Sequence, residues 1–205
     1  ATATPSPSPA PSGGARLRVL HASPDAPELA ITVAGRPPFT LGYTDLSFYQ
    51  SLPPGAQGVQ VAVAGADGPP LIELSPTVEA SQVVTLALAN TLAQIQPLVL
   101  GDDLTPPAPG TVHLRLLHAA ADAPAVDLAV AGGPVLFPNA GFGAVTAHTP
   151  LPAGGYTFEV RVAGATVPAV TTRPLTLDSG DIYTATLLGR SANNTLRLIV
   201  YPDNV

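Results

Sequence analysis

The chain has 205 residues and a net charge of −6, and only 11% of its residues are charged, against roughly a quarter in an ordinary soluble domain. All eight basic residues are arginines that stand apart from one another, so no basic stripe favours nucleic acid or an anionic membrane as a partner. Cysteine is absent, which excludes disulfides, a thiolate nucleophile and a zinc–thiolate site.

Residues 1–14, with the sequence ATATPSPSPAPSGG, form a Pro/Ser-rich leader that is typical of an extended spacer. A chain that starts without methionine is interpreted as the product of signal removal, so we expect export and an extracellular or cell-surface location. The lack of cysteine and methionine, the two most oxidisable residue types, suits such a location, and a GC-rich genome that favours arginine over lysine is an equally good explanation. No apolar run approaches the roughly 18 residues of a membrane helix, and we predict no membrane span.

Residues 15–103 are predicted to form a first domain of short strands separated by turns of glycine and proline. In the first strand, 15–21, Leu17 and Val19 lie on one face, whereas two arginines and Leu20 lie on the other. Further strands are expected at residues 29–34, 47–51, 58–64, 71–74, 83–89 and 95–100.

Residues 104–110 are predicted to be a linker around a run of prolines, and residues 111–205 a second domain. Its strands are expected at residues 112–118, 126–131, 144–149, 156–163, 169–177, 182–188 and 196–201. About seven short strands per copy and no helical period predict an all-β chain with two tandem immunoglobulin-like antiparallel β-sandwich domains.

The two domains are predicted to be copies of each other, because one motif occurs twice. LRVLHASPDAP at residues 17–27 returns as LRLLHAAADAP at residues 114–124, and LPPG at residues 52–55 returns as LPAG at residues 151–154. Val84-Thr85 likewise corresponds to Tyr183-Thr184. Conserved order at nearly constant spacing indicates a tandem repeat.

These motifs resemble the bacterial family called domain of unknown function 4397. The first copy carries His-Ala-Ser-Pro-Asp-Ala-Pro intact from His21 to Pro27, whereas the second has Ala120 and Ala121 in place of Ser-Pro. The resemblance covers nearly all of residues 15–204. It implies a secreted or surface-exposed immunoglobulin-like β domain, and it implies no particular activity.

A histidine and an aspartate four residues apart occur in both motifs, and such a pair can form part of a catalytic triad or orient a metal ligand. The nucleophile is missing, because Ser23 corresponds to Ala120 and no Gly-x-Ser-x-Gly elbow occurs. We therefore predict a structural motif in which the aspartate accepts hydrogen bonds from nearby backbone amides and the histidine ties strand to loop. Its residues are His21, Asp25, Pro27, His118, Asp122 and Pro124.

No metal site or cofactor is predicted. His113 and His118 are five residues apart in one strand and point to opposite faces, and His148 has no histidine near it in sequence. Asp178 and Asp181 flank a glycine turn without the alternating oxygen ligands of a tight calcium loop.

Most of the ten aromatic residues are expected in the cores. Tyr43, Phe48 and Tyr49 cluster in a segment that differs from its counterpart in the second copy. Because exposed aromatic rings form platforms for sugars, these three are the candidate ligand contacts.

Tandem copies, low charge and the lack of a catalytic constellation favour a non-catalytic structural protein that self-assembles head to tail into an extracellular filament or surface layer. Its partner would be a further copy of the chain, contacted by Ala1, Thr2, Ala3, Thr4 and Pro5. The alternative is a monomeric cell-envelope adhesion module that binds a glycan or another protein. A hydrolase that uses His118 and Asp122 is the third hypothesis.

Overall fold

A computed structural model describes residues 13–204 of the chain, and every structural statement below concerns these residues. The predicted contacts of residues 1–5 and most of the predicted leader lie outside them. No described helix is long and apolar enough to cross a membrane.

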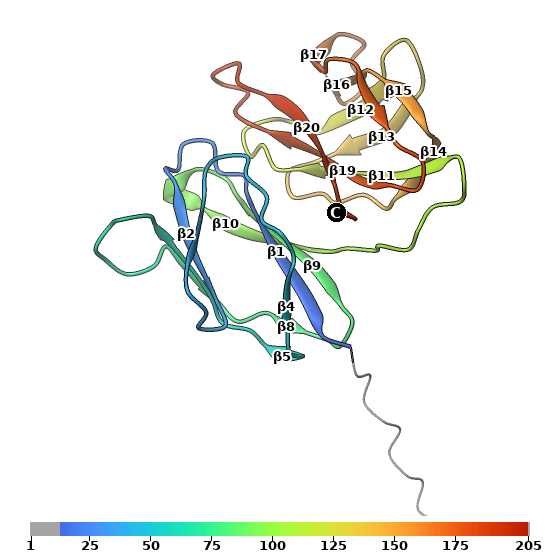
Figure 1. The fold of residues 1–205 in the computed structure, drawn as a ribbon. Helices are drawn as coiled ribbons and strands as arrows, with labels where there is room; N and C mark the ends of the chain where they lie inside the picture. The colour runs from blue at the N-terminus through green and yellow to red at the C-terminus, as the bar shows by residue number, and fades with distance from the viewer. Residues whose placement is uncertain (1–12, 205) are drawn as a thin grey trace, which may run out of the picture.

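The first copy is built from two four-stranded sheets and a two-stranded ribbon (Figure 1). The sheet β10-β9-β1-β4 packs on the sheet β3-β2-β6-β7, and β5 pairs with β8. The elements are β1 (Ala15–His21), β2 (Leu29–Val33), β3 (Phe39–Leu41), β4 (Gln50–Leu52), β5 (Gly55–Ala56), β6 (Val59–Val63), β7 (Ile72–Leu74), β8 (Thr77–Val78), β9 (Val83–Ala89), the 3-10 helix η1 (Leu92–Gln94) and β10 (Gln96–Gly101).

The second copy repeats this arrangement. The sheet β14-β11-β19-β20 packs on the sheet β13-β12-β16-β17, and β15 pairs with β18. The elements are β11 (Thr111–His118), β12 (Val126–Val130), β13 (Val135–Ala140), β14 (Thr149–Pro152), β15 (Gly154–Tyr156), β16 (Phe158–Val162), β17 (Pro168–Thr171), β18 (Leu175–Leu177), β19 (Ile182–Leu188) and β20 (Arg197–Pro202).

The predicted all-β tandem sandwich is confirmed, and each copy adds one parallel strand pair to otherwise antiparallel sheets. The first strand of each copy, β1 or β11, pairs in parallel with β9 or β19. Both members of these pairs are buried along most of their length, as parallel strands usually are.

The strands predicted at residues 47–51 and 144–149 were misplaced, because β4 and β14 begin only at Gln50 and Thr149. In both copies a side-chain hydroxyl accepts a hydrogen bond from a backbone amide of the neighbouring strand. Ser47 Oγ accepts a hydrogen bond from the Val19 amide at 2.9 Å, and Thr146 Oγ1 accepts one from the Leu116 amide at 2.9 Å. The preceding segments are therefore irregular, apart from single bridges to β1 and β11.

Each sandwich has its own apolar core, and the two copies share a third apolar cluster where they meet. The alternation of β1 explains this division: Leu17 and Val19 face the core of the first copy, whereas Leu20 joins the shared cluster. The buried members of the shared cluster are Leu20, Ala22, Ala87, Ala89, Leu100, Leu117, Ala119 and Leu188.

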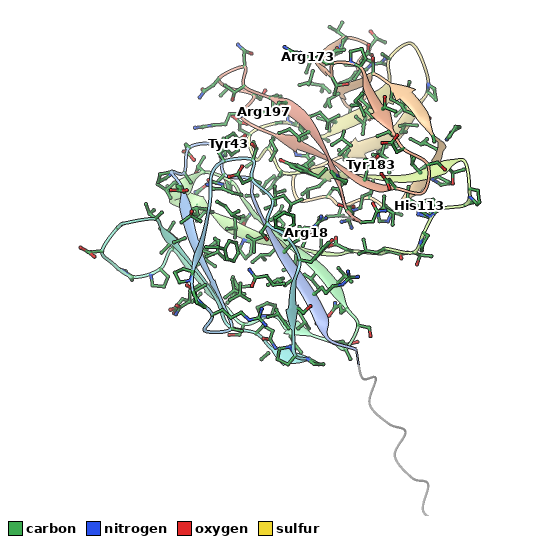
Figure 2. The ribbon with its side chains drawn as sticks, in the orientation of Figure 1. Arg18, Tyr43, His113, Arg173, Tyr183 and Arg197 are labelled. Atoms are coloured by element: carbon green, nitrogen blue, oxygen red, sulfur yellow. The ribbon has the colours of Figure 1, made fainter. Side chains whose placement is uncertain are left out.

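Four charged side chains are buried beside this shared cluster and are paired across the copies. Arg18 of β1 donates to Asp203 Oδ1 at 2.5 Å, and Arg115 of β11 donates to Asp102 Oδ1. The side chains of the four residues are no more than 4% exposed. Figure 2 shows Arg18 on the side of the first copy that faces the second.

A threonine in each copy completes the network. Thr85 Oγ1 accepts from Arg18 Nε at 2.8 Å and donates to Asp102 Oδ2 at 2.5 Å. Thr184 does the same between Arg115, at 2.8 Å, and Asp203, at 2.6 Å. The arginine of one copy and the aspartate of the other thus neutralise each other twice, in a reciprocal arrangement.

We expect Asp203→Ala to lower the free energy of unfolding by about 3–5 kcal/mol, because the change leaves two buried guanidinium groups, Arg18 and Arg115, with the single carboxylate of Asp102. Equilibrium denaturation with urea measures the loss. Glu73→Ala is the control, because it removes an exposed carboxylate bonded only to Gln60 and is expected to change stability little. Equal effects of the two changes would contradict the importance of the network.

Candidate functional site

The two motif histidines are fully buried at the ends of β1 and β11, and each is bonded to its own loop. His21 Nε2 lies 3.0 Å from the Pro27 carbonyl oxygen, and the Ser23 amide donates to Nδ1 at 3.3 Å. His118 Nε2 lies 3.2 Å from the Pro124 carbonyl oxygen. A ring that accepts at Nδ1 and donates at Nε2 is neutral, so His21 ties the strand to the following turn as an uncharged group.

The motif aspartates bind a different loop from the one that holds the histidines. Asp25 Oδ1 accepts from the Leu92 amide at 2.8 Å. Asp122 accepts from the Ser191 amide at 2.8 Å and the Ala192 amide at 3.1 Å. Each carboxylate therefore clamps the loop after β9 or β19, and no imidazole–carboxylate hydrogen bond forms within residues 13–204.

The environment of Asp122 keeps its carboxylate ionised. Partial burial by itself would raise the pKa of Asp122, but the hydrogen bonds from the two backbone amides, together with Arg190, outweigh it and lower the pKa. Among the described residues, no three histidine, aspartate or glutamate side chains gather in a way that could hold a metal ion.

The three candidate ligand contacts separate in space. Tyr49 turns inward: its hydroxyl donates to Asp102 Oδ2 at 2.8 Å, and the Arg18 guanidinium lies 4.5 Å from its ring centroid. Burial raises the pKa of Tyr49, and the neighbouring Asp102 carboxylate raises it further. Tyr49 therefore belongs to the buried network between the copies.

Tyr43 also lies at the junction of the copies. Its ring contacts the His21 ring edge-on, with centroids 6.0 Å apart, and the Arg197 guanidinium of the second copy lies 4.7 Å from its centroid. Figure 2 shows Tyr43 and Arg197 close together where the two copies meet. Of the three aromatic residues, Phe48 alone is exposed, with 85% of its surface accessible.

Phe48 lines a groove of about 630 Å³ on the first copy. The groove lies where β3 and β4, the edge strands of the two sheets, leave one side of the sandwich open. Its walls are mainly apolar, from Pro37, Phe39, Leu41, Leu46 and Phe48.

Three of the four polar side chains that line this groove make a hydrogen bond within the protein, and the fourth, Gln50, makes none within the described residues. Arg36 donates to the Ser51 carbonyl oxygen at 2.6 Å, and Asp45 Oδ2 accepts from the Gly42 amide at 2.9 Å. Ser47 accepts from Val19, as described above. The groove therefore offers apolar surface more than free hydrogen-bonding groups.

The second copy provides an internal comparison for this groove. Leu46 and Val145 form equivalent bridges to β1 and β11, so Phe48 corresponds to Ala147. The second sandwich thus folds with a methyl group where the first exposes an aromatic ring. The exposed ring of Phe48 is therefore not a requirement of the fold.

The architecture defines the chain as a tandem β-sandwich protein. The sequence profile of the family described as "Domain of unknown function (DUF4397)" matches residues 15–129 and 128–205. The chain belongs to this family, which confirms the resemblance seen in its motifs. No curated protein matches the chain in sequence.

Two solved structures that match the chain are distant likenesses. One is the family 26 carbohydrate-binding module CBMbc of Amy13K from Eubacterium rectale, solved in complex with maltoheptaose. It has 11% identity and a TM-score of 0.32, with coverage of 92% of this chain and 97% of that one. Another is the TIE protein of Bacillus anthracis, with 11% identity and a TM-score of 0.28 over 87% of this chain and 35% of that one.

The buried network was not recognised as a site from the sequence, although two features mark it. An arginine occupies the same place in both copies, in Leu17-Arg18 and Leu114-Arg115. An aspartate directly follows the last strand of each copy, at Asp102 and Asp203. Because strand alternation assigns these arginines to the outer face, a single sandwich gives no reason to expect them buried.

We expect stability to fall as pH drops below about 6.5, because burial lowers the pKa of His21, His118 and His148 beneath this ordinary value. Between the lowered pKa values and 6.5, the unfolded chain binds more protons than the folded one, so acid favours unfolding. Urea denaturation at about pH 7.5 and about pH 5 measures the change. Both pH values lie above the range in which carboxylates protonate, so the histidines dominate the difference.

In the variant His21→Gln/His118→Gln, the free energy of unfolding is expected to change less between about pH 7.5 and about pH 5 than in the unaltered protein. NMR titration of the imidazole carbons in the unaltered protein gives an independent measurement. Ring pKa values at or above 6.5 for all three histidines would contradict the expectation.

Proposed function

We propose that the chain is a non-catalytic binding module of the cell surface or extracellular matrix, which holds an apolar segment of a partner protein in the groove beside Phe48. One observation carries the proposal: Phe48 is 85% exposed at the rim of an apolar groove, whereas its counterpart in the second copy is Ala147. An exposed aromatic ring that the fold does not need is typical of a binding residue.

The chemistry of the groove favours a protein over a sugar. A sugar requires many donors and acceptors, but the walls of the groove are mainly apolar, and its few polar side chains, Arg36, Asp45, Ser47 and Gln50, lie at the rim. In contrast, an apolar side chain of a partner would gain stability by contact with Phe39, Leu41, Leu46 and Phe48.

The strands beside the groove add a second means of binding. Within the described residues, β3 pairs only with β2 and β4 only with β1, so each has one free edge. An extended segment of a partner could therefore form backbone hydrogen bonds to either strand while it inserts a side chain into the groove.

The head-to-tail filament predicted from the sequence stays a prediction, because the residues assigned to it, 1–5, lie outside the described part of the chain. Support for the binding module comes from a described groove. A non-catalytic role agrees with the motif geometry, in which Asp25 and Asp122 bind backbone amides. An exterior location fits the lack of cysteine and methionine.

We expect Phe48→Ala to weaken binding of peptides that are selected from a displayed random library against the intact protein. Burial of a phenylalanine contributes about 1.5–3 kcal/mol, so affinity should fall about tenfold or more. Calorimetric titration measures it. Because Phe48 is 85% exposed, the free energy of unfolding should change by no more than about 0.5 kcal/mol.

Val167→Ala is the matched control, because Val167 is 75% exposed on the second copy and does not line the groove. It should leave peptide affinity unchanged. Peptides whose affinity is insensitive to Phe48→Ala would overturn the proposal. If instead an envelope oligosaccharide binds and Phe48→Ala abolishes this binding, the partner of the groove is a glycan and not a protein.

A further inference from the structure

A second candidate site, separate from the Phe48 groove, lies where the motif loops of the two copies meet. It is a cleft of about 300 Å³. Pro24 of the first motif and Ala121 of the second, which occupy the same position of the repeat, both line it. The cleft therefore exists only when both copies are present and held in place.

The walls of this cleft are part polar and part apolar, and they differ between the copies. The first copy contributes Asn90, Thr91 and Gln94 from the segment between β9 and β10. The second contributes Asp122 and Arg190, together with the ring of Phe142. One aromatic ring among side chains that carry amides, a hydroxyl, a carboxylate and a guanidinium is a composition suited to a hydroxylated ligand.

Several of these groups are held in place and still have hydrogen-bonding capacity. Both carboxylate oxygens of Asp122 accept from loop amides, which fixes the carboxylate in position. Asn90 Oδ1 accepts from the Thr91 amide at 2.8 Å, and this bond orients the side-chain amide while its NH₂ group is not used. Gln94 is exposed and makes no side-chain hydrogen bond within the described residues.

Arg190 adds a donor that lacks a partner. Its Nε is buried without a hydrogen bond within residues 13–204, and the nearest carboxylate oxygen, Asp122 Oδ2, is 3.7 Å away. This separation exceeds a hydrogen bond. The Nε atom is itself out of reach of a ligand, but the side chain is 35% exposed and its Nη groups make no hydrogen bond within the described residues, so they remain able to bind a small polar ligand.

The charges of the cleft decide the class of ligand. A carboxylate and a guanidinium lie side by side, so the local charge balances and favours a neutral molecule. An anion would be repelled by Asp122 and by the net charge of −6 of the chain. A cation would be repelled by Arg190, and the one carboxylate that could attract it is already bonded to backbone amides. Hydroxyl groups both donate and accept, as these mixed partners require.

We propose that this cleft binds a neutral sugar ring, with its hydroxyl groups on Gln94, Asn90, Asp122 and Arg190 and its apolar face toward Phe142. The volume is sufficient for one sugar unit, with the open side available for a longer chain. The docking of the copies by the buried arginine–aspartate network fixes the two walls at this separation.

The test is a titration of the full chain with neutral methyl glycosides of glucose, galactose, mannose and N-acetylglucosamine, followed by amide chemical shifts in NMR spectra. For so small a ligand we expect a Kd on the order of millimolar. The shifts should concentrate on the amides of residues 90–94 and 190–192. Glucuronate and glucosamine serve as charged probes and are expected to bind more weakly.

Gln94→Ala and Gln94→Ala/Arg190→Ala should weaken binding of the best glycoside by about tenfold or more. The matched control is Gln96→Ala, which removes the same side chain from an exposed position outside the cleft and should leave Kd unchanged. Thermal unfolding confirms that each variant folds. If the double variant does not fold, the single variant Gln94→Ala is sufficient to test the proposal.

Three results would overturn the proposal: no shift at the cleft with any neutral glycoside up to about 50 mM, equal weakening by Gln96→Ala, or binding of the charged probes alone. The outcome is independent of the Phe48 groove. A Phe48→Ala variant that loses peptide binding should retain sugar binding, so the failure of one proposal does not decide the other.

Discussion

The reciprocal pairing of two buried arginines with two buried aspartates determines how this molecule is arranged. Transfer of four charges out of water is costly, and the cost is offset only when every charge has a partner and the remaining donors and acceptors are bonded. Arg18 and Asp203 meet across the junction, as do Arg115 and Asp102, and a threonine of each copy links the two pairs. The four charges sum to zero, and each copy supplies one of each sign. A change of the angle between the copies would separate both pairs at once, so the network favours one relative orientation.

This orientation explains why the motif loops of the two copies meet and form the cleft. The sheets that contain β1 and β11 are buried on both faces, by their own core on one side and by the other copy on the other. The motif loops at the ends of these strands are therefore brought to the same place. Tyr43 and Tyr49 contact the junction for the same reason, whereas Phe48, which lies between them in the sequence, is left exposed.

The sequence predicted the repeat, the sandwich class and most long strands, because these depend on local patterns. Strand alternation and turn residues gave β9 and β19 with their observed bounds. Local patterns could not predict how the copies dock. In a single sandwich, Arg18 would face solvent. It is buried because the second copy docks against it and supplies the carboxylate of Asp203, which is 185 residues away in the sequence. Tyr43, Phe48 and Tyr49 form one cluster in the sequence, but the docked copy divides them into two half-buried residues at the junction and one exposed residue.

Duplication also separates what the fold requires from what a copy can vary. The arginine, the threonine and the aspartate of the network occur in both copies, because a reciprocal junction needs each of them twice. Several groove and cleft residues differ between the copies: Phe48 corresponds to Ala147, and the loop of Asn90 and Gln94 faces a different loop that carries Arg190. Since both copies fold with the same topology, these differences are not needed for folding. They are the positions at which a pair of equal sandwiches can acquire two unequal binding surfaces.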